Sequence, residues 1–150
     1  MELTTLCYIE KDNKYLMLNR TKKENDINTG KWIGVGGHFE KGETPNECII
    51  REVYEETGLT LKKFYLRGIL TFIADKDFVE YIWLYTASEF EGELQECNEG
   101  ELAWIDKDKV MELNLWEGDK VFLRLLNERK EFFSLKLEYE GDRLINVKLE

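Results

Sequence analysis

Three glutamates in this chain have a spacing that could serve metal-dependent chemistry. Glu52, Glu55 and Glu56 stand at i, i+3 and i+4 within the segment GHFEKGETPNECIIREVYEETGL, residues 37–59. Residues three and four apart share one face of a helix, so these carboxylates are expected to converge. Like charges at that spacing destabilise a bare helix, and a bound cation would remove the repulsion. Carboxylate oxygens suit Mg²⁺, with Mn²⁺ as a substitute, and Mg²⁺ commonly accompanies phosphate groups. The pattern therefore predicts a divalent-metal site that acts on a phosphate compound.

The helix that must carry these glutamates has well-defined ends in the sequence. Thr44 and Glu47 have the spacing of a capping box. Pro45 falls at the first helical position, where proline is favoured, and Gly58 is suited to end the helix. We therefore predict a helix over 45–57. Its apolar face, beside the glutamate face, consists of Ile49, Ile50 and Val53.

The remaining segments predict a sheet around this helix. Runs rich in β-forming residues predict strands at 4–10, 15–19, 35–39, 62–74, 79–87 and 102–105. A polar loop is expected over 21–30, a short helix over 107–111 and a second main helix over 118–127. The chain is expected to end in a β-hairpin that turns at Glu140-Gly141-Asp142. This order predicts an α+β fold in a single domain, 1–150, with a mixed sheet sandwiched between helices.

Composition and charge narrow the class of protein. The length of 150 residues suits one domain with a real core. A net charge of −10 argues against binding nucleic-acid polymers or anionic membranes, which require a basic surface. The start of the chain does not read as a signal peptide, and no apolar run is long enough to span a membrane. Three distant cysteines without a CxxC pair fit a reduced, cytoplasmic protein. We expect a small-molecule partner and either a monomer or a homodimer.

The glutamate segment resembles the Nudix box, G-x5-E-x7-R-E-U-x-E-E-x-G-U, in which U is apolar. Every fixed position of that motif is filled, by Gly37, Glu43, Arg51, Glu52, Val53, Glu55, Glu56, Gly58 and Leu59. The approach to the box, with Gly30-Lys31-Trp32, Gly34 and Gly36, is similar to that of the family. The stretch from Leu115 to Asp119, with the helix and hairpin after it, resembles MutT-type hydrolases of oxidised purine nucleoside triphosphates.

The resemblance implies a Nudix fold and hydrolysis of a nucleoside diphosphate linked to another group. A triphosphate such as 8-oxo-dGTP would give a monophosphate and pyrophosphate. Glu52, Glu55 and Glu56 match the family's metal ligands, joined by a backbone carbonyl of Gly36 or Gly37. Glu43 and Arg51 match a buried ion pair that ties the loop to the helix.

Two further residues are candidates for the reaction itself. Glu99, by its position before the strand at 102–105, resembles an extra metal ligand or general base, with Glu96 and Glu101 as rivals. Arg20 is a candidate phosphate contact because arginine pairs strongly with phosphate. The plainer interpretations are a solvated loop charge for Glu99 and a surface ion pair for Arg20.

A nucleotide base could be recognised by residues near the second helix. Trp116 could stack on a purine, although it could equally belong to the core. Asp119 resembles an aspartate that hydrogen-bonds the base. The chain departs from the oxidised-purine enzymes at Ile33, where some carry an asparagine, and at Gly118, where they carry a second aspartate. An apolar Ile33 cannot read polar groups on a base, so broader purine use stays open beside the oxidised purine substrate that the resemblance implies.

Other aromatic, histidine and cysteine residues have structural interpretations. His38 is expected to be an exposed loop residue, Cys48 a small packing residue, and Trp32 and Trp104 core aromatics. The same box also serves hydrolases of ADP-ribose or dinucleoside polyphosphates. A Nudix-fold module that binds without catalysis is the remaining alternative, although such modules usually lose box glutamates and this chain keeps them all.

Overall fold

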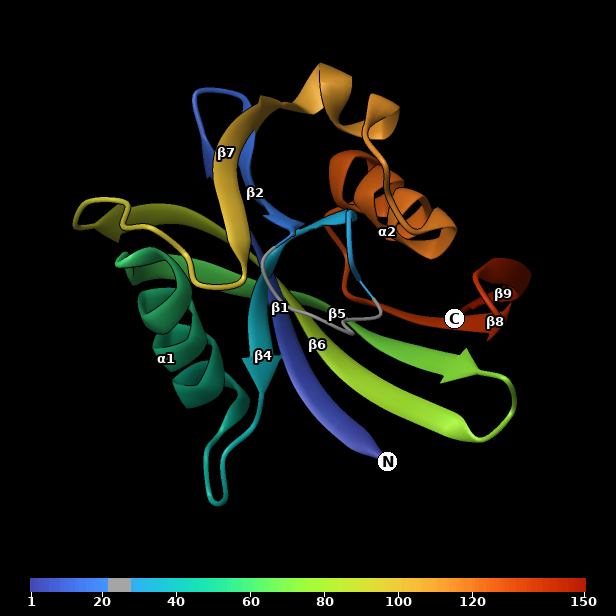
Figure 1. Ribbon diagram of the computed structural model, residues 1–150. Coiled ribbons are helices and arrows are strands. Elements are labelled where there is room, and N and C mark those ends of the chain that lie inside the picture. The colour runs from blue at the N-terminus through green and yellow to red at the C-terminus, as the bar shows by residue number, and fades with distance from the viewer. Residues whose placement is uncertain (22–27) are drawn as a thin grey trace.

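The elements alternate between strands and helices in the order that the sequence predicts. The computed structural model describes residues 1–21 and 28–150, so most of the polar loop expected over 21–30 lies outside the described residues (Figure 1). The strands are β1 (Glu2–Lys11), β2 (Lys14–Arg20), β3 (Trp32–Ile33), β4 (Val35–His38), β5 (Thr60–Ala74), β6 (Phe78–Glu91), β7 (Gly100–Asp106), β8 (Phe133–Glu140) and β9 (Arg143–Leu149). The helices are α1 (Pro45–Thr57), the 3-10 helix η1 (Lys107–Glu112) and α2 (Glu117–Glu128).

The described strands pair into one mixed sheet. Their order is β3-β2-β1-β6-β5-β8-β9, with β4 paired to β1 and β7 paired to β2. β1 lies parallel to β6, and β5 lies parallel to β8, whereas the other pairs are antiparallel. The C-terminal β8–β9 hairpin is present as expected. The α+β architecture with a mixed sheet is therefore confirmed.

Helix α1 begins and ends where its capping residues predict. The Thr44 side chain accepts a hydrogen bond from the Glu47 backbone at 3.1 Å, and the Glu47 side chain accepts one from the Thr44 backbone at 2.9 Å. Gly58 follows with a left-handed φ of 81°. A side chain there would also collide with Gln95, since an added Cβ would lie 2.7 Å from the Gln95 Cγ. Local sequence thus fixes the position of the glutamate face.

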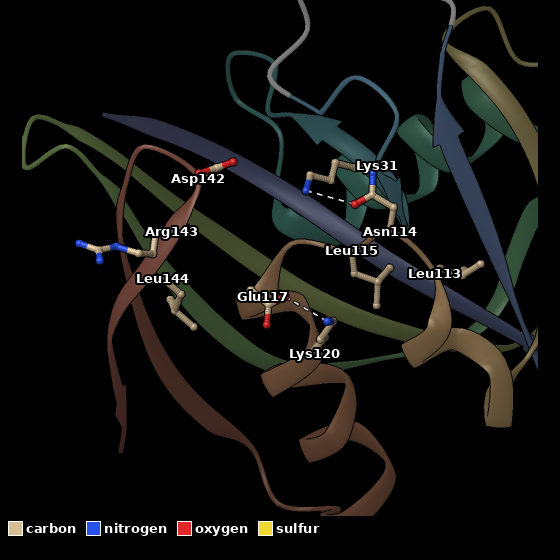
Figure 2. A pocket seen from close by; sticks show the side chains of 9 residues that line it. All are labelled: Lys31, Leu113, Asn114, Leu115, Glu117, Lys120, Asp142, Arg143 and Leu144. Carbon is tan, nitrogen blue, oxygen red and sulfur yellow. Dashed lines mark hydrogen bonds and ion pairs between the residues drawn. The ribbon is translucent and has the colours of Figure 1, made fainter.

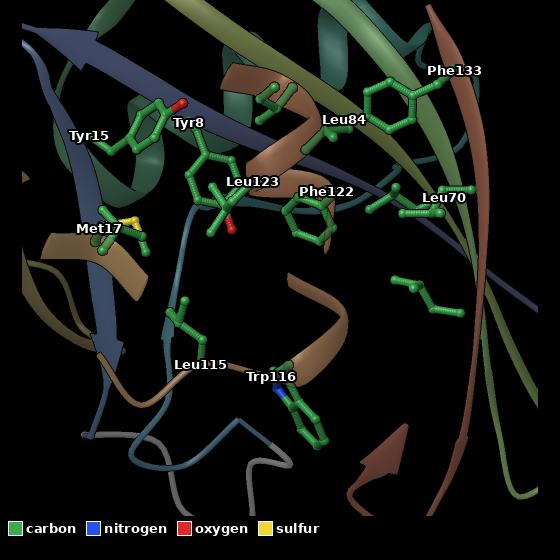
Figure 3. Packing of buried hydrophobic residues seen from close by; sticks show 14 of the residues in the cluster. Tyr8, Tyr15, Met17, Leu70, Leu84, Leu115, Trp116, Phe122, Leu123 and Phe133 are labelled. Carbon is green, nitrogen blue, oxygen red and sulfur yellow. The ribbon is translucent and has the colours of Figure 1, made fainter. Parts of the chain in front are cut away.

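The two main helices cover opposite faces of the sheet (Figure 1). On one face, Ile49 and Val53 of α1 pack in a cluster with residues of β1, β2 and β6. On the other face, Phe122 and Leu123 of α2 pack in a second cluster, which also contains Tyr8 of β1 (Figure 3). Because β1 and β6 contribute to both clusters, they form the shared middle layer on which both helices are positioned.

Some details differ from the sequence expectation. The two-residue strand β3 was not predicted, and it pairs with β2 through the register of Leu18 with Ile33. Strands β5 and β6 are longer than expected, at 15 and 14 residues, because their pairing continues away from the turn as far as Thr60 opposite Glu91. The turn that joins them contains Asp75 and Lys76, both with positive φ. Trp32 is partly buried against the α2-side cluster and Trp104 against the α1-side cluster. Within the described part of the chain, no helix combines the length and apolar character needed to cross a membrane.

Candidate active site

One pocket of about 540 Å³ is lined by most of the residues that the sequence marks as functional. Strands β1, β4, β5 and β6, helices α1 and α2 and the loop before β7 contribute to its wall. The predicted site residues that line it are Arg20, Ile33, Gly36, Gly37, Glu52, Glu56, Glu99, Trp116 and Asp119. The predicted site residues Glu43, Arg51, Glu55 and Gly58 lie outside that lining.

Glycines of β4 bring the backbone close to the glutamates of α1. The Gly36 N–H donates a hydrogen bond to Oε1 of Glu56 at 3.2 Å. A Cβ at Gly37 would lie 2.5 Å from the carboxylate of Glu52, so a side chain there would displace this carboxylate. The backbone carbonyl of Gly37 accepts from the Thr5 hydroxyl at 3.3 Å. The close approach of β4 to α1 therefore depends on residues without side chains.

The Glu56 carboxyl is buried in an acidic environment. The residue is 9% exposed, and its Oε2 has no hydrogen-bond partner within residues 1–21 and 28–150. Burial, followed by the charges of Glu99 and Glu52, raises the pKa of Glu56 to about 8. Burial also raises the pKa of Glu52. Buried charges in proteins are paired or coordinate metals, so an orphaned carboxylate oxygen facing two other carboxylates fits a divalent cation.

The carboxylates do not yet form a closed ligand set. Over the two described ranges, no three His, Cys, Asp or Glu side chains lie close enough together to form a ready-made metal site. Glu52, Glu56 and Glu99 are nevertheless near enough for their charges to act on one another. Like charges repel, so a cation bound between these side chains would stabilise their closer approach.

Arg51 forms the centre of an ion-pair network behind the pocket. Its Nε and Nη2 contact the two oxygens of Glu43 at 2.6 and 2.9 Å, which is a bidentate arrangement. Its Nη1 contacts Glu52 at 2.8 Å and Glu55 at 3.2 Å. The hydrogen bond from Arg51 lowers the pKa of Glu43 to about 2. Glu55 belongs to the same network but lies outside the pocket lining, and its side chain is 57% exposed.

Arg20 and Glu99 form an ion pair in the pocket, near Glu56. Arg20 Nη1 lies 3.2 Å from Glu99 Oε2, with side chains that are 11% and 32% exposed. This ion pair places a cationic group beside the α1 glutamates, in reach of an anionic ligand. Glu96 and Glu101, the rivals of Glu99, are exposed and do not line the pocket.

Trp116 belongs both to the core and to the pocket. Its ring is 8% exposed and packs edge-on against Tyr139, with centroids 5.4 Å apart. Its Nε1 donates to Asn28 at 2.7 Å, and the ammonium of Lys31 lies 5.0 Å from the ring centroid. These contacts hold the indole in one orientation at the start of α2 (Figure 3). The alternatives of core or pocket for Trp116 are therefore not exclusive.

Asp119 sits in the first turn of α2 beside Trp116. Protein surrounds its carboxyl, although the pocket leaves part of the residue accessible. Burial raises the pKa of Asp119 to about 8, with a smaller opposing effect from Lys31. The neighbouring Gly118 has no room for a side chain, since an added Cβ would lie 2.7 Å from the Tyr139 hydroxyl. That hydroxyl accepts the Gly118 N–H at 2.6 Å, so packing explains why a second carboxylate is absent at this position.

A second cavity of about 640 Å³ opens on another side of α2 (Figure 2). Its lysines are already engaged, Lys31 with Asn114 at 3.4 Å and Lys120 with Glu117 at 3.0 Å. None of the glutamates of α1 lines it. The catalytic chemistry is therefore expected in the first pocket.

Sequence reasoning missed several pocket residues. Thr4 of β1, Phe72 of β5 and Glu80 of β6 line the pocket, and none was singled out from the sequence. The period-two alternation of a strand could have placed them on one face, but only once the partners of β1 and β6 were known. His38 is exposed at the end of β4, where its Nε2 lies 3.1 Å from Glu2. Cys48 is buried beside the Thr5 hydroxyl, at 3.4 Å.

Replacing Asp119 by Asn is expected to stabilise the nucleotide-free protein increasingly as pH rises. The folded protein retains the Asp119 proton up to about pH 8, whereas the unfolded chain releases it near the ordinary value of 3.8. Folding then binds an extra proton, so wild-type stability falls across this range and the variant escapes the loss. Melting temperatures at about pH 5 and about pH 8 test this expectation. Asp108→Asn, at an exposed aspartate of η1, is the control, and a difference that does not change with pH would contradict it.

Comparisons with known proteins agree with this architecture. A family model described as the NUDIX domain matches residues 2–126. The Bacillus subtilis protein named uncharacterized Nudix hydrolase YvcI is 32% identical over 79% of this chain and 75% of its own length. An oxidized purine nucleoside triphosphate hydrolase of Danio rerio is 28% identical over 99% of this chain and 94% of its own. The crystal structure of a MutT protein from Bacillus halodurans superposes with a TM-score of 0.90 at 29% identity, covering 100% of this chain and 98% of the other.

The mixed sheet between two helices and the acidic pocket beside α1 define an α+β hydrolase of phosphate anhydrides. The chain belongs to the Nudix family and is MutT-like. It is a Nudix hydrolase that acts on pyrophosphate bonds of nucleoside diphosphate derivatives, and its substrates are small nucleotides. Members of this family typically use a divalent metal.

Proposed function

We propose that the protein is a Mg²⁺-dependent pyrophosphohydrolase of purine nucleoside triphosphates, oxidised purines such as 8-oxo-dGTP included. The products would be a nucleoside monophosphate and pyrophosphate. The observation that carries the proposal is the continuity of the pocket. One cavity is lined both by the carboxylates of α1 and by Trp116 and Asp119 of α2. A nucleotide can therefore present its phosphates to the first group while its base reaches the second.

The phosphate part of the pocket would hold the cation and the scissile bond. Glu52, Glu56 and Glu99 are the proposed ligands, supported by the orphaned oxygen of Glu56 and by the mutual influence of the three charges. Glu55 and the Gly36 carbonyl are further candidate ligands. Bound Mg²⁺ would supply charge neutralisation of the phosphates and a lowered pKa for a water molecule. Arg20 is proposed to bind a phosphate oxygen while Glu99 keeps it in place at 3.2 Å.

The scaffold around this part keeps the carboxylates oriented. We propose that the bidentate pair of Arg51 with Glu43 ties the loop before α1 to the helix, and that Gly58 ends the helix. Arg51 also contacts Glu52 at 2.8 Å, so the same guanidinium fixes a proposed ligand. Orientation of reacting groups lowers the barrier because less freedom is lost at the moment of reaction.

The nucleoside part favours a purine. The Trp116 ring is held by Asn28 at 2.7 Å and offers a flat surface on which a base can stack. Below about pH 8 the Asp119 carboxyl holds its proton, so it can both donate and accept a hydrogen bond at a base edge. The name of the Danio rerio relative, an oxidized purine nucleoside triphosphate hydrolase, supports the same substrate class. Ile33 offers only an apolar surface, which favours a broad purine range.

A hydrolysis panel with purified protein and Mg²⁺, read out by separating and quantifying the nucleotide products, tests the proposed substrate. The substrates are 8-oxo-dGTP, dGTP, dATP, 2-hydroxy-dATP, ADP-ribose and diadenosine polyphosphates. We expect turnover of the purine triphosphates, with kcat/KM for 8-oxo-dGTP roughly tenfold above that for dGTP, because hydrogen-bond differences in a pocket give discrimination of that order or more. Activity confined to ADP-ribose or to the dinucleotides would overturn the substrate proposal and leave the Nudix chemistry in place.

A further inference from the structure

We propose that Glu80, held by Thr4, is a specificity-determining residue that accepts a hydrogen bond from the nucleoside part of the substrate. The donor would be an amino group of the base or a hydroxyl of the sugar. This inference rests on the proposed function, since it assigns a role within the same pocket. Neither residue belongs to the Nudix box.

The strand register places Glu80 on the floor of the pocket. β1 lies parallel to β6, with Glu2 opposite Glu80 and Thr4 opposite Ile82. β6 pairs with β5, with Glu80 opposite Phe72. Alternate residues of a strand face the same side of a sheet. Thr4, Ile82 and Phe72 all line the pocket with Glu80, as does Glu2 at the start of β1, so Glu80 stands between apolar side chains and the Thr4 hydroxyl.

The carboxyl of Glu80 is arranged as an acceptor. Its Oε2 accepts a hydrogen bond from the Thr4 hydroxyl at 2.7 Å, which fixes the side chain. A carboxylate has about four acceptor positions, and this bond uses one of them. The charged groups that influence Glu80 are His38 and Glu2, which lie at the rim and are paired with each other at 3.1 Å. Burial raises the pKa of Glu80, so the sheet carries a polar group here at a cost in stability.

The charge of Glu80 indicates which part of the substrate it meets. A carboxylate close to a triphosphate would be repelled unless a cation lay between them. The α1 glutamates and Arg20 mark the phosphate part of the pocket, and Glu80 lies on β6 away from that helix. Its neighbours on the floor, Phe72 and Ile82, are suited to the flat face of a base. Glu80 is therefore placed to meet the nucleoside.

A line of aromatic rings connects the Trp116 part of the pocket with the Glu80 part. Trp116 contacts Tyr139 at 5.4 Å between centroids, and Tyr139 contacts Phe72 at 5.1 Å. Phe72 in turn contacts Phe78 at 6.1 Å, close to Glu80 in the chain. A planar base lying along this wall would have Asp119 near one edge and Glu80 near another. Two carboxyl groups beside one base favour nucleosides that carry hydrogen-bond donors.

Binding of nucleoside monophosphates tests this role without requiring turnover. Kd is measured by calorimetry for dGMP against dIMP, which lacks the 2-amino group, and for GMP against dGMP, which lacks the 2′-hydroxyl. In the wild type we expect one of these pairs to differ roughly 10- to 30-fold in favour of the nucleotide that carries the donor, because a hydrogen bond to a charged group has that magnitude. In Glu80→Leu the difference should fall close to onefold, and Glu80→Gln, which keeps an acceptor oxygen, should retain part of it.

The pair that loses its difference identifies the donor, as a base amine or as a sugar hydroxyl. Glu89→Leu, at an exposed glutamate on the far part of the same strand, should leave both ratios unchanged, and melting curves confirm that each variant is folded. Ratios that Glu80→Leu leaves as in the wild type, or a wild type that discriminates in neither pair, would overturn the assignment. Failure of the proposed function shows separately, as an absence of pyrophosphate release from triphosphates by the wild type.

Discussion

Replacing Glu56 by Gln is expected to lower kcat by roughly 1000-fold while the protein still folds, because loss of a carboxylate that we propose to bind the metal removes several kcal/mol of transition-state stabilisation. Gln has nearly the same shape, and its carbonyl oxygen can still accept the Gly36 N–H that lies 3.2 Å from Oε1 in the wild type. What the variant loses is the negative charge of the buried oxygen that has no hydrogen-bond partner in the described residues. The prediction thus separates the charge of Glu56 from its packing.

The metal-free stability of the same variant gives an independent readout. Because burial and the charges of Glu99 and Glu52 raise the pKa of Glu56 to about 8, its ionised form is costly in the folded protein. The unfolded chain releases this proton near 4.5, so wild-type stability falls as pH rises between 4.5 and about 8. Glu56→Gln should therefore melt at or above the wild-type temperature near neutral pH, in the presence of a chelator.

A matched control distinguishes the active-site effect from a general effect of losing a carboxylate. Glu89→Gln removes an exposed glutamate whose carboxylate lies 3.7 Å from the Lys63 ammonium, and it should leave kcat and melting temperature unchanged. Steady-state kinetics with saturating Mg²⁺ and thermal melting measure both quantities. A Glu56→Gln protein that turns over at close to the wild-type rate would remove Glu56 from the catalytic site.

Local signals in the sequence were sufficient for α1 and its surroundings. Thr44, Glu47, Pro45 and Gly58 act within one or two turns of chain, so their effect does not depend on tertiary context. The helix consequently has the predicted bounds, 45–57. Most of the individual strands and the C-terminal hairpin could also be predicted, because strand runs and turn residues are themselves local patterns.

Contacts between distant segments could not be predicted from those patterns. The parallel pairing of β1 with β6 joins residues almost eighty positions apart, as in the hydrogen bond between Thr4 and Glu80, whose sequence separation is 76. The placement of Glu55 is a second example. Helical spacing puts it beside Glu52 and Glu56, but its side chain contacts Arg51 at 3.2 Å and lies outside the pocket lining. Periodicity identifies a helix face, whereas the competing ion pairs on that face decide where each side chain points.

Replacing Arg51 by Gln is expected to lower the free energy of unfolding by roughly 2 kcal/mol, because charged hydrogen bonds of this kind contribute about 1.5–3 kcal/mol and their carboxylate partners would remain partly buried. The guanidinium is 22% exposed and contacts Glu43, Glu52 and Glu55, as well as the His38 carbonyl at 3.0 Å. Gln can satisfy only one or two of these acceptors. Urea unfolding near neutral pH measures the loss, and Arg143→Gln, at an arginine that is 74% exposed, should change little.

Acid should erase most of the difference between wild type and Arg51→Gln. The hydrogen bond from Arg51 lowers the pKa of Glu43 from 4.5 to about 2, so its stabilising contribution is complete above pH 4.5 and is lost as pH falls through about 2. The two proteins should therefore converge in stability on acidification, and a gap that stays constant with pH would assign Arg51 a packing role instead. Near neutral pH the variant should also lose catalytic rate, because the 2.8 Å contact that orients Glu52 is removed. Arg51→Lys distinguishes the two effects. A lysine keeps the positive charge but not the planar fork, so it should recover part of the stability while failing to hold Glu43 and Glu52 together.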